Sequence, residues 1–102
     1  MKRVFTLIAA FAAVALLTVA AQAGSKGEQI FNKKCAMCHA VKGKGGAIGP
    51  ELTTVSARMS EKDIKAKIIN PQKANPASSM PAFATLPKAE MNSLLGYLKT
   101  LR

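Results

Sequence analysis

The apolar residues of this 102-residue chain fall into four blocks with different spacing. The first block is a continuous run near the N-terminus. The other three repeat every three or four residues, which is the spacing of a helix that buries one face. Glycine, proline and lysine are common between the blocks, where they favour turns and loops. The chain has no run of alternating apolar and β-branched residues of the kind that predicts a strand, so no significant sheet is expected. The pattern predicts an all-α domain behind a hydrophobic N-terminal segment.

The second block opens with a helix-start signal. Ser25 and Glu28 have the spacing of a capping box, in which a hydroxyl and a carboxylate bond the free amides of the first turn. A helix should begin directly after Ser25 and run into Cys35. Gly27 and Phe31 would lie on its inward face.

The third and fourth blocks predict two further helices. Ser60 is a cap for a helix of about three turns that ends where Asn70 and Pro71 follow. Pro87 suits the first position of the last helix. That helix has an apolar stripe spaced three and four residues apart, formed by Met91, Leu94, Leu95, Leu98 and Leu101.

The connecting segments have their own local chemistry. Residues 40–46 are rich in glycine and lysine, which predicts an irregular loop. A tight turn is expected at Gly49 and Pro50, because glycine permits an unusual backbone angle and proline fixes the next one. Residues 71–87 contain four prolines, which favour an extended loop over a regular helix.

The first block has the layout of an export signal. Lys2 and Arg3 precede an uncharged run, residues 4–20, and residues 21–23 form a small-x-small cleavage site. We therefore expect residues 1–23 to be a signal peptide and residues 24–102 to form the mature domain. The alternative is an uncleaved anchor, because the run is just short of a comfortable membrane span.

The mature domain is too small to bury a large core by itself. Subtracting 23 residues from 102 leaves 79, which makes a single domain. Domains of this size bury only about 60% of their unfolded surface and commonly need a metal or a disulfide. A further group is therefore expected to complete the interior.

Residues 35–39 read Cys-Ala-Met-Cys-His and contain both cysteines and the one histidine of the chain. This string is the attachment signature of a c-type haem, with two thiols for the porphyrin and an imidazole for the iron. A structural zinc site would need a fourth nitrogen or sulfur ligand. A redox-active dithiol would need a βαβ context. A plain disulfide between Cys35 and Cys38 remains the alternative to one covalently bound haem c.

An iron held by His39 has an open axial position, and no second histidine can fill it. Methionine is therefore the candidate. We select Met80 because it lies in the proline-rich loop, where the following proline disfavours helix. Met37 lies between the anchoring cysteines and cannot reach the opposite face. Met91 belongs to an apolar helix stripe, whereas Met59 stays open as a lesser alternative.

Five motifs together resemble a small bacterial class I cytochrome c over the whole mature chain. They are residues 35–39, 48–52, 70–71, 80–83 and 94–98. The resemblance implies a cytochrome c fold, with three to four helices wrapped around one haem. It also implies thioether bonds from Cys35 and Cys38 and iron bonds from His39 and Met80. Pro50 would offer its carbonyl to the other nitrogen of His39.

The resemblance makes one packing prediction and shows one departure. Gly27 and Phe31 would meet Tyr97 where the terminal helices cross. Many relatives use a tryptophan to bond a haem propionate, but this chain has none. Arg58 or Asn70 could take that role, although each can equally be a solvated charge and a helix stop.

Charge bears on the partners. The chain carries 15 basic and five acidic residues, a net charge of +10, and loss of Lys2 and Arg3 leaves +8. In an exported protein this favours acidic redox proteins, membrane-bound electron-transfer complexes or transient contact with an anionic membrane, rather than nucleic acid. The alternative is that the charge serves solubility alone.

These features predict a function in electron transfer. The expected protein is a periplasmic, monomeric one-electron carrier of a respiratory or similar chain, and not an enzyme. The alternative is a five-coordinate haem protein for gas sensing or peroxide chemistry. Peroxide chemistry needs a distal acid or base, usually histidine, and the one histidine is already assigned to the proximal side.

Overall fold

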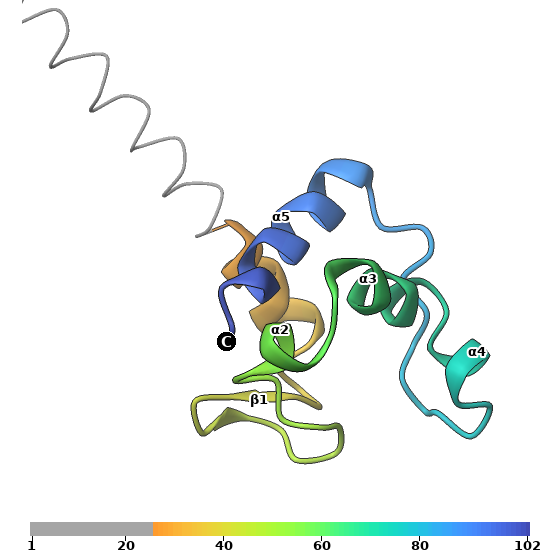
Figure 1. Ribbon diagram of the computed structural model, residues 1–102, viewed down its shortest axis with the longest axis horizontal. Coiled ribbons are helices and arrows are strands. Elements are labelled where there is room, and N and C mark those ends of the chain that lie inside the picture. Colours follow the sequence, from red (N-terminus) through yellow and green to blue (C-terminus); the bar gives the residue numbers. More distant parts are fainter. Residues whose placement is uncertain (1–25) are drawn as a thin grey trace, which may run out of the picture.

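The computed structural model describes residues 26–102, so the expected signal peptide and the expected cap at Ser25 lie outside the described residues. Figure 1 shows a set of short helices with one small hairpin. No helix within the described residues is long and apolar enough to cross a membrane. The elements are the N-terminal helix, described over residues 26–34, β1 (Ala40–Val41), β2 (Lys44–Gly45), α2 (Val55–Arg58), α3 (Glu61–Ile69), α4 (Pro71–Ala74) and α5 (Lys88–Lys99). The expectation of an all-α fold is confirmed.

The two terminal helices cross in close contact, as expected (Figure 1). Gly27 is buried, and a Cβ atom there would lie 2.8 Å from the Tyr97 Cβ and closer still to the Ser93 carbonyl oxygen. Beside this contact the Phe31 and Tyr97 rings pack with their centroids 5.5 Å apart. Glycine at position 27 therefore sets how closely the N-terminal helix approaches α5.

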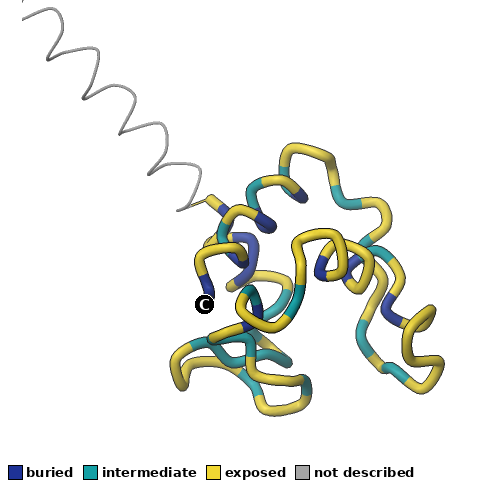
Figure 2. Tube along the Cα trace, viewed as in Figure 1, coloured by how far each residue is buried: buried dark blue, intermediate teal, exposed yellow. Residues whose placement is uncertain are grey.

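The core lies where the N-terminal helix, α2, α3 and α5 meet (Figure 2). The whole predicted stripe of the last helix is buried, and Leu101 continues it beyond the helix end. The Leu101 carbonyl oxygen accepts a 2.8 Å bond from the Ser56 amide, which ties the C-terminus to α2. The buried hydrophobic residues are Ile30, Phe31, Val55, Ile64, Ile68, Met91, Leu94, Leu95, Leu98 and Leu101.

The starts of α3 and α5 follow local sequence signals. The Ser60 hydroxyl accepts a 3.2 Å bond from the Asp63 amide and caps α3, as expected. Asn70 then ends α3. Pro87 occupies the cap position of α5 instead of the first helical position, so this helix begins one residue later than expected.

Two connecting segments are more regular than expected. Residues 40–46 form a hairpin in which Ala40 pairs with Gly45. Its turn places Lys42 and Gly43 at positive φ, 52° and 79°, the backbone twist that suits a tight hairpin. The proline-rich segment begins with the single-turn helix α4, because Pro71 at the first helical position loses no hydrogen bond. The short helix α2 was also not expected.

The two helical glycines should respond in opposite ways to alanine. Gly27→Ala places a methyl group against α5, and such overpacking costs about 1–3 kcal/mol of unfolding free energy. Gly96→Ala is the matched control: nothing lies within 4 Å of the added Cβ, so helix propensity should stabilise the protein by about 0.5–1 kcal/mol. Denaturant unfolding measures both. Equal shifts would contradict the close crossing.

Candidate functional site

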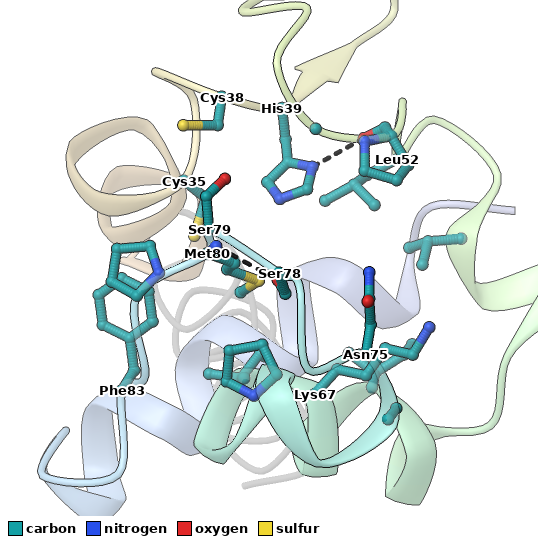
Figure 3. Close-up of a pocket in the computed structure, with 18 of the residues that line it drawn as sticks. Cys35, Cys38, His39, Leu52, Lys67, Asn75, Ser78, Ser79, Met80 and Phe83 are labelled. Atoms are coloured by element: carbon teal, nitrogen blue, oxygen red, sulfur yellow. Dashed lines mark hydrogen bonds between the residues drawn. The ribbon is translucent and has the colours of Figure 1, made fainter.

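A cavity of about 480 Å³ opens beside the Cys-x-x-Cys-His motif, within the range usual for small-ligand sites. The structure brings all five sequence-predicted site residues to its wall. The end of the N-terminal helix, the 48–52 turn, α2, α3, α4 and the proline-rich loop all contribute to the lining. Figure 3 shows the side chains that surround it. The predicted residues are Cys35, Cys38, His39, Pro50 and Met80.

The motif folds back on the helix end that precedes it. The Cys35 amide continues the helical pattern with a 2.8 Å bond to the Phe31 carbonyl oxygen. The amides of Cys38 and His39 then both bond the Cys35 carbonyl oxygen, at 3.2 and 3.0 Å. This tight turn places two half-buried thiols and one imidazole on the same wall. The two thiols are not joined in a disulfide.

Burial raises the pKa of the Cys35 thiol to about 11. Loss of hydration is the main cause, the Lys34 ammonium opposes it, and Cys38 adds to it. Because the thiolate is the reactive form, the folded free chain holds Cys35 as a weakly nucleophilic thiol at neutral pH. The Cys35 thiol thus lacks the lowered pKa of an activated catalytic cysteine.

The His39 ring is held in one orientation by its neighbours. Its Nδ1 atom donates to the Pro50 carbonyl oxygen at 2.7 Å. A carbonyl oxygen only accepts, so Nδ1 carries the proton and the Nε2 lone pair is free for a metal. Metal-bound histidines commonly have such an outer partner.

Gly49 serves this ring by leaving space, which corrects the sequence expectation of an unusual backbone angle. Gly49 is not among the glycines with positive φ. Instead, a Cβ atom at position 49 would lie 2.5 to 3.0 Å from three atoms of the His39 imidazole. The Gly49 amide bonds the Cys38 carbonyl oxygen at 2.7 Å, so turn and motif are also joined directly.

Met80 faces the cavity from the loop on the other side. Figure 3 shows the His39 ring and the Met80 side chain entering the same space from different segments. The Met80 amide bonds the Ser78 hydroxyl at 3.2 Å, and the Phe83 amide bonds the Ile68 carbonyl oxygen at 2.9 Å. The loop is therefore fastened to α3 close to Met80.

The other methionines occupy distinct environments. Met37 is 83% exposed and Met91 is 5% exposed within the core. Met59 is half-buried and lines the same cavity as Met80. The fold thus separates Met37 and Met91 from the site, and it supplies two thioethers to the cavity.

Two polar residues of the lining were not identified from the sequence. Lys67 follows Ile64 by three residues on α3, so this exposed lysine lies beside the buried face of the helix, a spacing that could have indicated its place in the lining. Asn75 is the C-cap of α4, and this helix was not predicted because the four prolines of residues 71–87 favoured an extended loop. Of the two candidates for a propionate contact, Arg58 lines the cavity, whereas Asn70 does not.

Comparison with known proteins gives consistent matches. The cytochrome c family model matches residues 24–102. A cytochrome c-553-like protein of Synechocystis sp. is 41% identical over 76 residues, covering 74% of this chain and 67% of that protein. Cytochrome c6 of Cyanidium caldarium is 34% identical over 73 residues, covering 71% and 65%. Cytochrome c oxidase subunit 2 of Alkalihalophilus pseudofirmus is 31% identical over 87 residues, covering 76% and 25%. The chain therefore spans a quarter of the oxidase subunit and about two thirds of the other two.

Gly49→Ala should displace the His39 ring and weaken its bond to Pro50. Loss of about 1 kcal/mol from that bond would speed solvent exchange of the Nδ1 proton roughly five- to tenfold, measured by NMR. Gly43→Asn is the control, because nothing lies within 4 Å of its Cβ and asparagine tolerates positive φ. Unchanged exchange in Gly49→Ala would refute the close packing.

Proposed function

Because this chain belongs to the cytochrome c family, we propose that it is a monohaem electron carrier that accepts and releases one electron at a time. One observation carries the proposal. A single cavity gathers both thiols, a preoriented imidazole and a thioether, which is the complete ligand set of such a centre. The bound haem c would supply an iron that alternates between the ferrous and ferric states.

Cys35 and Cys38 would hold the haem through thioether bonds. They are separated by two residues, lie on one wall and are not paired with each other. The cavity volume and its largely apolar lining fit a flat macrocycle. His39 would bind the iron through Nε2, with Pro50 fixing the ring through Nδ1. These roles follow from the chemistry of the donors and from their placement.

Met80 would supply the second protein ligand that holds the iron. It enters the cavity from the proline-rich loop, a segment separate from the motif, and bonds at Ser78 and Phe83 restrain that loop. A thioether suits low-spin iron and raises the reduction potential relative to a second histidine. Prolines at 76 and 81 further stiffen the loop. A restrained ligand limits reorganisation between the two oxidation states.

With His39 and Met80 both holding the iron, no position on it would stay open for a substrate, so we propose no enzymatic role. The five-coordinate alternative for gas sensing or peroxide chemistry has weaker support. The sequence contains one histidine, and we assign that residue to the iron, with its Nδ1 atom bonded to the Pro50 carbonyl oxygen. No second imidazole is available as a distal acid or base.

We propose that residues 1–23 direct export and are removed, leaving a periplasmic domain that begins at Gly24. The charged start, apolar run and cleavage pattern support this, as does the family match beginning at residue 24. The mass of the natively expressed protein tests the division. A retained N-terminus would favour the membrane-anchored alternative.

The partners we propose are acidic redox proteins or membrane-bound electron-transfer complexes. Met37 and Ile48 are large apolar residues that are 83% and 76% exposed, and both lie at the motif or the cavity mouth. Lys42 and Lys44 are exposed on the hairpin, which joins the motif where the Gly46 amide bonds the Ala36 carbonyl oxygen at 2.8 Å. An apolar contact bordered by positive charge suits brief docking to an acidic surface.

Met80→Leu should open the iron to carbon monoxide in the ferrous protein and abolish the weak red absorbance band that methionine gives to ferric haem. Leucine keeps the volume but offers no donor atom. Met59→Leu is the matched control because Met59 lines the same cavity, and it should keep the band. Loss of the band in Met59→Leu alone would move the ligand assignment to Met59. Absorbance spectroscopy distinguishes these results.

Electron transfer to an anionic oxidant should slow as salt is raised, because ions screen charges over about 10 Å at 0.1 M. Lys44→Gln should lower the low-salt rate by roughly two- to threefold, as loss of one exposed charge allows. Lys26→Gln is the charge-matched control, because Lys26 is exposed at the start of the N-terminal helix, whereas the Cys-x-x-Cys-His motif follows the end of that helix. Stopped-flow rates with an anionic and a cationic oxidant measure the effect. A salt-independent rate would leave solubility as the role of the charge.

A further inference from the structure

The cavity wall that faces Cys35 and Cys38 carries polar head groups. In Figure 3 the two cysteines lie on one side, and the ends of Lys67 and Asn75 lie across the cavity from them. The lining is mostly apolar, and Lys67 and Asn75 are exposed residues whose polar ends border it, where a polar part of an occupant would reach them. The arrangement indicates a site for an acidic group.

Helices α3 and α4 set the backbone positions of these two exposed residues. Lys67 lies three residues after Ile64 and one before Ile68, two buried residues that also line the cavity. Asn75 ends α4, where its side-chain oxygen accepts a 3.1 Å bond from the Ala77 amide. That bond turns the side-chain oxygen toward the Ala77 amide, and the NH₂ group has two N–H donors for a carboxylate.

Arg58 adds a second cation from α2. One terminal nitrogen of its guanidinium donates to the Glu51 carbonyl oxygen at 3.0 Å, which holds the group at the cavity wall. The remaining N–H groups of the planar guanidinium are suited to bind a carboxylate. The Glu51 carboxylate itself accepts from the Thr53 hydroxyl and does not line this cavity.

The charged lining of the cavity has one sign. Among residues 26–102 its charged side chains are Lys34, Arg58 and Lys67, and no carboxylate lines it. Lys34 immediately precedes Cys35 and belongs to the cysteine side. The titratable groups of the motif, Cys35, Cys38 and His39, complete the set. An anionic group in this cavity would therefore meet no carboxylate from residues 26–102, and opposite the cysteines it would meet the Lys67 ammonium and the Asn75 amide.

We propose that Arg58, Lys67 and Asn75 bind the two propionates of the haem, an inference that rests on the proposed function. The thioether carbons and the carboxylates lie on opposite edges of this macrocycle. Anchoring one edge at Cys35 and Cys38 therefore directs the carboxylates to the other side. These three residues take the place of the missing tryptophan. Asn70 is excluded, since it connects α3 to α4 outside the cavity lining.

The test uses the holoprotein and its midpoint potential. A cation beside a propionate neutralises a charge that otherwise favours ferric iron, and it keeps the carboxyl ionised. Lys67→Met should shift the electron-exchange equilibrium toward the ferric form by on the order of tenfold, which is about 59 mV for one electron. It should also make the potential vary with pH near neutrality, as a propionate takes up a proton. Lys67→Arg should restore both properties.

Lys65→Met is the matched control, because Lys65 loses the same charge from the same exposed helix but does not line the cavity. Its potential should shift less, with an unaltered pH profile. Equal shifts and equal profiles in Lys65→Met and Lys67→Met would overturn the proposal for Lys67. The comparison thus separates a direct contact from a general loss of charge.

A second pair of variants tests the proposed role of Asn75 without removing a lysine. Asn75→Asp places a like charge against the propionates, so the pH at which the potential changes should rise. Asn70→Asp adds the same charge outside the cavity lining and should not produce this rise. Identical profiles would overturn the role of Asn75. Failure of the proposed function would show itself separately, as a wild-type protein without covalent haem or without a low-spin spectrum.

Discussion

The close crossing of the N-terminal helix and α5 is the constraint on which the rest of the structure depends. It rests on the absence of a side chain at Gly27, which lets Phe31 and Tyr97 pack beside it. The crossing fixes where the N-terminal helix ends, and Cys35 continues from that end through its bond to Phe31. The placement of both thiols and the imidazole therefore depends on a contact between two helices that includes neither the cysteines nor His39.

The core and the cavity share a wall. Val55, Ile64, Ile68 and Leu98 are buried residues of the hydrophobic cluster, and the same four line the cavity. A small domain that leaves such residues facing a cavity has not finished burying its apolar surface. A flat apolar group seated there would complete the interior. Binding of the proposed cofactor would therefore stabilise the fold, because it would cover core residues that line the cavity.

Polar groups around the cavity act on different atoms of the proposed cofactor. The Pro50 carbonyl oxygen bonds the His39 Nδ1 atom and leaves Nε2 free to bind a metal. The loop of Met80 is restrained by bonds to Ser78 and α3, which limits ligand motion. Arg58 and Lys67 line the cavity and would act on the charge of the proposed propionates. Orientation, rigidity and electrostatics thus come from three separate segments of the fold.

The sequence by itself determined the parts of this protein that rest on local chemistry. The cap at Ser60, the stripe from Met91 to Leu101 and the Cys-x-x-Cys-His string each act through neighbours a few residues away, so their spacing was enough to predict helices and a haem motif. Only the tertiary structure decided what depends on distant segments. It showed that Gly49 serves the His39 ring, that α4 forms among prolines, and that Met59 shares a cavity with Met80. It also brought Arg58, Lys67 and Asn75 to one cavity from three helices or helix ends. The spacing of residues in one sequence does not show such contacts, because they form only when elements distant in the sequence pack together.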